Sequence, residues 1–225
     1  MQQLLARVLM ASLFIGAAWA IVRPFLTMVV FTLVFSRLGS MPSGGVPYPL
    51  FAYAALVPWF FFSNSVNSGT LSLITYRNIV TKTYFPREIV PLAQVASRLV
   101  DLGASAGLYA LLMVYYGVVP GVWFSLLPFF ILLLIAFTIG VTFTTSAVNV
   151  FYRDVNPVVQ IGLQLWLYLT PVAYPLSAVP EKYRIFFMLN PLSAVVEGLR
   201  SALVYNRAPD MTLVAVSTTI IGALL

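Results

Sequence analysis

The sequence contains neither cysteine nor histidine. Without cysteine the chain forms no disulfide and offers no thiol nucleophile, and without either residue it lacks the usual ligands of transition metals. Charged residues are also scarce, at 8% of the 225 positions, whereas 61% of the positions are hydrophobic. These shortages argue against a cysteine enzyme or a metalloenzyme, and a chain this apolar does not fold as one soluble core. We therefore expect a protein of the lipid bilayer.

Long uncharged runs predict several membrane helices. No Lys, Arg, Asp or Glu occurs from Leu102 to Tyr152, and this run is more than twice the roughly 20 residues that one helical span needs. Gly and Pro between Gly117 and Gly121 suit a turn between two antiparallel spans. Arg153 and Asp154 mark the next turn, because an uncompensated charge is costly in hydrocarbon.

The same reasoning, continued along the chain, predicts an all-α polytopic membrane protein with one domain over residues 1–225. After the fifth span the apolar patches are too short to cross, and Pro180 and Asn190-Pro191 are suitable starts for two short re-entrant helices. The sixth span begins near Met211 and is expected to continue past the end of the sequence. The expected spans cover about residues 19–36, 50–74, 89–116, 123–149, 157–176 and 211–225, and the re-entrant helices about 180–189 and 191–205.

The net charge of +6 has two interpretations. In a soluble protein it would suggest nucleic acid, but the twelve Lys and Arg residues are scattered between membrane spans. They are better interpreted as topology determinants and lipid-headgroup contacts, so no nucleic-acid partner is expected. Their numbers are balanced between the two sets of loops, and charge alone leaves the orientation open.

Five motifs occur in order along the chain. They are "GAAWAIVRPFLTMVVFTLVF" (16–35), "YPLFAYAALVPWFFFSNSV" (48–66), "KTYFPREIVPLA" (82–93), "NVFYRDV" (149–155), and "TPVAYP" with "LNPLSAVVEGLRSAL" beyond it. Together they make the sequence resemble the membrane permease of type-2 ABC exporters, in the branch that exports O-antigen, capsule or teichoic acid polysaccharide. The resemblance implies the type-2 ABC exporter fold, with six spans, both chain ends in the cytoplasm, and a multi-pass location in the inner (plasma) membrane.

The resemblance also implies partners. Members of this family work as a dimer of permeases bound to two separate ATP-binding cassette subunits, with ATP and Mg held by those subunits and no cofactor in the permease. The residues independently favour a separate ATPase, because no Gly-x4-Gly-Lys-Ser/Thr motif occurs and the only lysines, Lys82 and Lys182, lack a glycine loop. We therefore expect a transport subunit that is not itself an enzyme.

A polysaccharide on a lipid carrier suggests a conduit lined by aromatic side chains. Flat rings stack on sugar faces, and Tyr and Trp add a hydrogen-bonding edge. Helix packing or lipid contact is the alternative for each of them. Arg98 and Asp101 lie three residues apart on one helical face and form either a polar patch in the conduit or a mutually neutralising pair buried between helices. The aromatic candidates are Tyr53, Trp59, Phe60, Trp166, Tyr168 and Tyr174.

Two further groups of residues are candidates for moving parts. Glu197 and Arg200, in the second re-entrant helix, are expected to help a gate hold its shape. A basic, aromatic loop is expected to dock on the ATPase, with lipid-headgroup binding as the alternative. The turn "FYRD" (151–154) is expected either to make a second cytoplasmic contact with the ATPase or only to stabilise its own conformation. The expected coupling residues are Arg77, Lys82, Tyr84, Phe85, Pro86, Arg87, Tyr152, Arg153 and Asp154.

These features predict the permease of an ATP-driven exporter that moves a lipid-linked polysaccharide, first of all O-antigen, out of the cytoplasm. Membrane lipids are the surrounding partner. The alternatives are a type-2 ABC exporter of a drug or another small molecule, a secondary transporter and a non-transporting assembly subunit. A secondary transporter would show inverted repeats and carboxylates placed as proton relays. The sequence shows no such repeat, and Asp101 has a suitable partner in Arg98.

Overall fold

The computed structural model describes residues 19, 21–38, 44–78, 86–152 and 154–225. In these residues every regular element is helical, which agrees with the predicted all-α class. The first described helix runs over Ile21–Ser36 and overlaps the π-helical element η1 (Thr32–Leu38), which ends this helical stretch. The other elements are α2 (Tyr48–Thr75), α4 (Ile89–Tyr115), η2 (Val122–Leu126), α5 (Leu127–Phe151), α6 (Val155–Leu169), η3 (Leu176–Ala178), α7 (Glu181–Met188), α8 (Pro191–Arg200), η4 (Ser201–Tyr205) and α9 (Met211–Leu224).

Three of these helical stretches are long and apolar enough to cross a membrane. They are α2, α4 and the continuous stretch Val122–Phe151, and two shorter apolar helices are Ile21–Ser36 and α9. The complete arrangement of six spans with a re-entrant pair stays a prediction.

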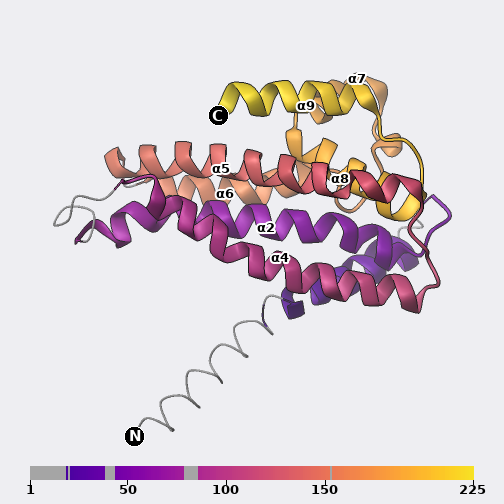
Figure 1. Ribbon diagram of the computed structural model, residues 1–225. Coiled ribbons are helices and arrows are strands. Elements are labelled where there is room, and N and C mark those ends of the chain that lie inside the picture. Colours follow the sequence, from indigo (N-terminus) through magenta and orange to yellow (C-terminus); the bar gives the residue numbers. More distant parts are fainter. Residues whose placement is uncertain (1–18, 20, 39–43, 79–85, 153) are drawn as a thin grey trace, which may run out of the picture.

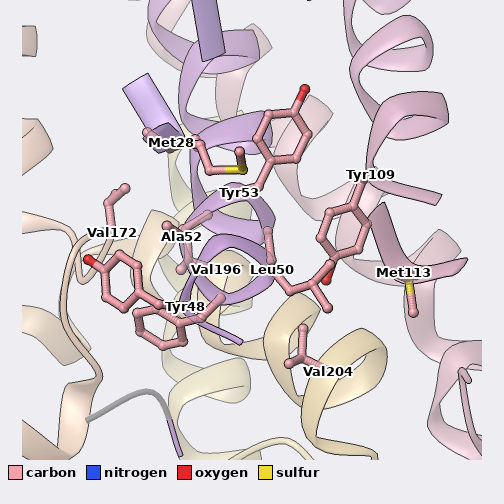
Figure 2. Close-up of a cluster of buried hydrophobic side chains, with 14 residues drawn as sticks. Met28, Tyr48, Leu50, Ala52, Tyr53, Tyr109, Met113, Val172, Val196 and Val204 are labelled. Atoms are coloured by element: carbon pink, nitrogen blue, oxygen red, sulfur yellow. The ribbon is translucent and has the colours of Figure 1, made fainter. Parts of the chain in front are cut away.

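Helix α2 is the centre of the bundle. Its half from Tyr48 to Phe62 is apolar around the whole circumference, as expected for a helix that packs on all sides. In the most apolar stretch of α2, 72% of the residues are buried, against 17% for α4. One cluster of buried side chains gathers around its first half, where Tyr48, Leu50 and Tyr53 meet Tyr109 from α4 and Val196 from α8 (Figure 2). A second cluster surrounds its middle and joins α5 and α8.

The ends of the helices are grouped. In Figure 1 the C-terminal ends of α2 and α5 and the N-terminal ends of α4 and α6 all lie at the left end of the bundle. Helix α9 lies outside α5 and α8 and packs against both. The two loops expected to contact an ATPase therefore leave the bundle at one end.

Glycine allows close contacts between helices, as two positions show. A Cβ atom on Gly69 of α2 would collide with Thr142 of α5, and a Cβ atom on Gly198 of α8 would collide with the Phe130 ring. Gly103 of α4 has open space around the position of a Cβ atom. The glycines of α2 and α8 therefore serve packing inside this chain.

Candidate functional site

A polar cavity of about 570 Å³ lies among the first described helix, α2, α4 and α6. Its lining includes Arg23, Asn64, Asn67, Arg98 and Gln160. An adjoining cavity of about 400 Å³ shares Arg23, Asn64, Asn67 and Gln160 with it. We call these two cavities together the polar groove. Polar side chains gathered inside a membrane bundle are costly unless they face water or a polar ligand, which makes the groove the main candidate site.

Helical periodicity explains why these polar side chains converge. Asn67 and Ser68 come three and four residues after Asn64, and Leu71 comes four and three residues after them, so all four lie on one face of α2. Gln160 and Gln164, four residues apart, share a face of α6 and line the groove from the other side. The sequence analysis missed these amides, although the polar spacing in "SNSVNS" (63–68) was the signal that could have found them.

Arg98 and Asp101 form an ion pair at the edge of the cavity. The distance from Arg98 Nη1 to Asp101 Oδ2 is 3.1 Å, and the side chains are 38% and 30% exposed. Both line the polar groove, so the pair faces the cavity instead of being enclosed between helices. Its part in transport stays a prediction.

The expected conduit aromatics lie in different places. Trp59 and Phe60 line the groove, and the Arg23 guanidinium lies 5.3 Å from the centre of the Phe60 ring. Tyr53 is fully buried and stacks on Tyr109. Of the eight conduit candidates, the structure thus brings Trp59 and Phe60 together with Arg98 and Asp101.

The three remaining candidates belong to α6 and the segment after it. Trp166 donates a hydrogen bond from Nε1 to Asn190 Oδ1 and packs edge-on against Phe62. Tyr168 is 71% exposed, and its carbonyl accepts a hydrogen bond from the Tyr174 hydroxyl at 2.6 Å. In a single copy of the chain these three side chains lie outside the lining of the groove.

Glu197 and Arg200 form the second ion pair, and this pair is buried. Arg200 Nη1 lies 3.2 Å from Glu197 Oε1, with side chains 0% and 12% exposed. The guanidinium also donates to the carbonyls of Phe51, Pro171 and Val172, at 3.2, 2.6 and 2.7 Å, and it lies 3.6 Å from the centre of the Phe51 ring. One side chain thereby joins α8, α2 and the segment that follows α6.

That segment, residues 170–174, is not helical. Pro171 cannot donate a backbone hydrogen bond, so α6 ends before it. Side chains donate to the carbonyls of residues 171–173: Tyr48 donates to Ala173 at 2.7 Å, and Arg200 donates to Pro171 and Val172. Asn190 Nδ2 donates to the Leu169 carbonyl at 3.2 Å. Irregular backbone inside a membrane protein requires such internal partners.

The coupling candidates lie at the end of the bundle shared by the two loops. Arg77, Pro86 and Arg87 are exposed where α2 ends and α4 begins, and Tyr152 and Asp154 are exposed between α5 and α6 (Figure 1). Four further candidates, Lys82, Tyr84, Phe85 and Arg153, lie outside the described residues.

Comparisons with known proteins give the family. The ABC-2 type transporter family matches residues 3–204. The O-antigen export system permease protein RfbA of Myxococcus xanthus is 32% identical over 216 residues, covering 93% of this chain and 82% of that protein. RfbA of Klebsiella pneumoniae is 28% identical over 84% of this chain and 73% of its own length.

A further relative is the polysialic acid transport protein KpsM of Escherichia coli, which is 24% identical over 84% of this chain and 73% of its own length. The long apolar helices, the groove between them and a family match over most of the sequence lead to one conclusion. The chain belongs to the ABC-2 type transporter family and is a multi-pass membrane permease.

Proposed function

We propose that this permease exports a lipid-linked polysaccharide, first of all O-antigen, from the cytoplasm across the inner membrane. The observation that carries the proposal is the similarity over 93% of the chain to a permease named for O-antigen export. The polar groove supports it, because amide side chains beside Trp59 and Phe60 combine hydrogen-bonding groups with flat apolar faces. Such a lining suits sugars better than an apolar drug.

The proposed complex contains two copies of this chain and two ATP-binding cassette subunits, which hold ATP and Mg. The exposed surface around Pro86 and Arg87, with Tyr152 and Asp154 beside it, forms the docking face. ATP binding draws the cassette subunits together, and their movement reaches the permease through these loops. The basic side chains Arg77 and Arg87 steer the partner by charge.

In the proposed topology, α6 and the non-helical segment 170–174 together form the fifth span. Helix α6 alone has 15 residues and is about 22 Å long, less than the roughly 30 Å of a hydrocarbon core. The first described helix and α9 belong to the first and sixth spans. Helix α7 and the stretch Pro191–Tyr205 form the re-entrant pair on the outer side, and Glu197 and Arg200 keep the shape of this gate.

The absence of cysteine offers a direct test of this topology. Single-cysteine variants Ser177→Cys and Asn78→Cys are labelled in whole cells with a membrane-impermeant maleimide after the outer membrane is permeabilised. Ser177→Cys should react and Asn78→Cys should react only after the inner membrane is opened. The reverse pattern would overturn the orientation.

The function is tested by reconstituting the permease with its ATPase subunits in proteoliposomes. Lipid-linked polysaccharide should stimulate ATP hydrolysis and reach the far side of the membrane, whereas stimulation by a hydrophobic drug alone would favour a drug exporter. Asn67→Leu and Gln160→Leu should slow export because they remove hydrogen-bonding groups from the groove. Gln94→Leu, on α4 outside the groove, is the matched control.

The docking face has a separate test. Phe85→Ala combined with Arg87→Ala should weaken assembly with the ATPase and impair export while leaving thermal unfolding of the permease unchanged. Normal export by this double variant would remove the coupling role of the loop.

A further inference from the structure

Two guanidinium groups line one cavity in the polar groove. Arg23 and Arg98 both line the cavity of about 570 Å³, and both also line a smaller recess of about 30 Å³ beside it. Asp101 is the only acidic side chain among the described residues that line either space. Two positive charges and one negative charge leave a local charge of +1, which favours an anionic ligand.

The donors of these two arginines are only partly used. Arg98 donates a hydrogen bond from Nη1 to Asp101 Oδ2, but its Nε is buried and has no hydrogen-bond partner among the described residues. Arg23 is held over the Phe60 ring and forms no ion pair within the described part of the chain. A cation in a membrane-spanning helix is costly unless a polar partner is present. The cavity therefore offers guanidinium donors without enough acceptors.

We propose that Arg23 and Arg98 bind a phosphate group in this cavity. A guanidinium presents a planar fork of N–H donors that matches the oxygens of phosphate, and two such forks match an anion with several oxygens and more than one charge. The amides of Asn64 and Gln160, which line the same cavity, add neutral donors. The cavity also has room beyond the phosphate for an attached group.

Two molecules present this chemistry in a membrane. One is the phosphate that joins a lipid carrier to its cargo, and the other is the headgroup of an ordinary phospholipid. The choice of the first source rests on the proposed function, whereas the phosphate site itself rests on the cavity alone. The experiment tests the existence of the phosphate site and the source of its ligand separately.

The test measures binding to the full-length permease, purified in a neutral detergent, by isothermal titration calorimetry. Farnesyl phosphate is the probe and farnesol is its uncharged match. Farnesyl phosphate should bind at least about tenfold more tightly than farnesol, because hydrogen bonds to charged groups are the stronger ones. Arg23→Gln should weaken farnesyl phosphate binding by about the same factor, while Arg23→Lys should keep part of the affinity.

A second variant distinguishes a binding role from a structural one. Asp101→Asn removes the carboxylate that competes for Arg98 and should tighten farnesyl phosphate binding, whereas loss of a purely structural ion pair would weaken or not change it. Lys182→Gln removes an exposed cation outside the cavity and should leave the affinity unchanged. Thermal unfolding of each variant checks that the protein is folded.

Three results would overturn the phosphate site: equal binding of farnesol, equal binding of the carboxylate farnesoate, or unchanged affinity in Arg23→Gln. If dihexanoyl phosphatidylglycerol competes as strongly as farnesyl phosphate, the site stands and its ligand is a phospholipid headgroup. If it does not compete, the ligand is the head of a lipid-linked cargo. Export in proteoliposomes is measured separately. Polysaccharide export without selective phosphate binding would refute only this inference. Phosphate binding without polysaccharide export would refute only the proposed function.

Discussion

Two ion pairs with the same sequence spacing should differ greatly in their effect on stability. Arg98–Asp101 and Arg200–Glu197 both join an arginine to a carboxylate three residues away, at 3.1 and 3.2 Å. The Arg98 side chain is 38% exposed and the Arg200 side chain is 0% exposed. The perturbation is the substitution Arg200→Leu, with Arg98→Leu as its matched control.

The magnitude follows from the partners that Arg200 leaves behind. No backbone amide of the described chain donates to the carbonyls of Pro171 and Val172, which Arg200 binds at 2.6 and 2.7 Å. Hydrogen bonds to a charged group contribute about 1.5–3 kcal/mol each, and breaking a buried ion pair costs about 3–5 kcal/mol. We expect Arg200→Leu to lower the free energy of unfolding by about 3–5 kcal/mol. Arg98→Leu breaks a partly exposed pair and should cost at most about 1 kcal/mol.

Thermal unfolding in detergent, followed by intrinsic tryptophan fluorescence, measures the difference. For a chain of this size about 1 kcal/mol changes Tm by roughly 2–4 °C, so Arg200→Leu should lower Tm by about 6–20 °C and Arg98→Leu by no more than about 4 °C. Arg200→Lys should lie between them, because one ammonium cannot reach every acceptor. Equal Tm values for the two leucine variants would show that Arg200 does not hold segment 170–174.

Three further predictions concern packing and the same segment. Gly69→Ala should destabilise the protein by about 1–3 kcal/mol because the new methyl group collides with Thr142, whereas Gly103→Ala, with open space around it, should cost nothing in thermal unfolding of the single chain. Asn190→Ala should cost about 2 kcal/mol, since Asn190 caps α8 and binds the Leu169 carbonyl, and an unchanged Tm would contradict this. Tyr48→Phe should cost about 1 kcal/mol in the same assay by removing the bond to Ala173.

Much of the helical layout was predictable because the signals are local. The uncharged run after Leu102 predicts a fold-back at Gly117–Gly121, and the structure ends α4 at Tyr115 and begins η2 at Val122. Pro180 and Asn190-Pro191 predict short helices, which appear as α7 and α8. The two arginine–carboxylate pairs were also visible, because residues three apart share a helical face.

The assignment of aromatic side chains to the conduit was much less predictable. The half of α2 from Tyr48 to Phe62, which carries Tyr53, Trp59 and Phe60, is apolar around its circumference, so its sequence does not indicate which side faces a cavity. Phe60 lines the groove, whereas Tyr53, on the same helix, is enclosed against Tyr109. The amides of α2 and α6 carried the clearer signal, since a polar side chain in a membrane helix needs a reason to be there.

By itself the sequence determined that the chain belongs in a bilayer. It also determined the approximate ends of most helices and the charged neighbours that pair along a helix. These properties depend on composition and on the spacing of nearby residues. Only the tertiary structure decided that Asn64 and Gln160 share one cavity and that Arg200 binds the backbone beyond α6. Such contacts depend on how separate helices are rotated and how they cross. Side-chain packing between distant segments sets this arrangement, and local periodicity does not encode it.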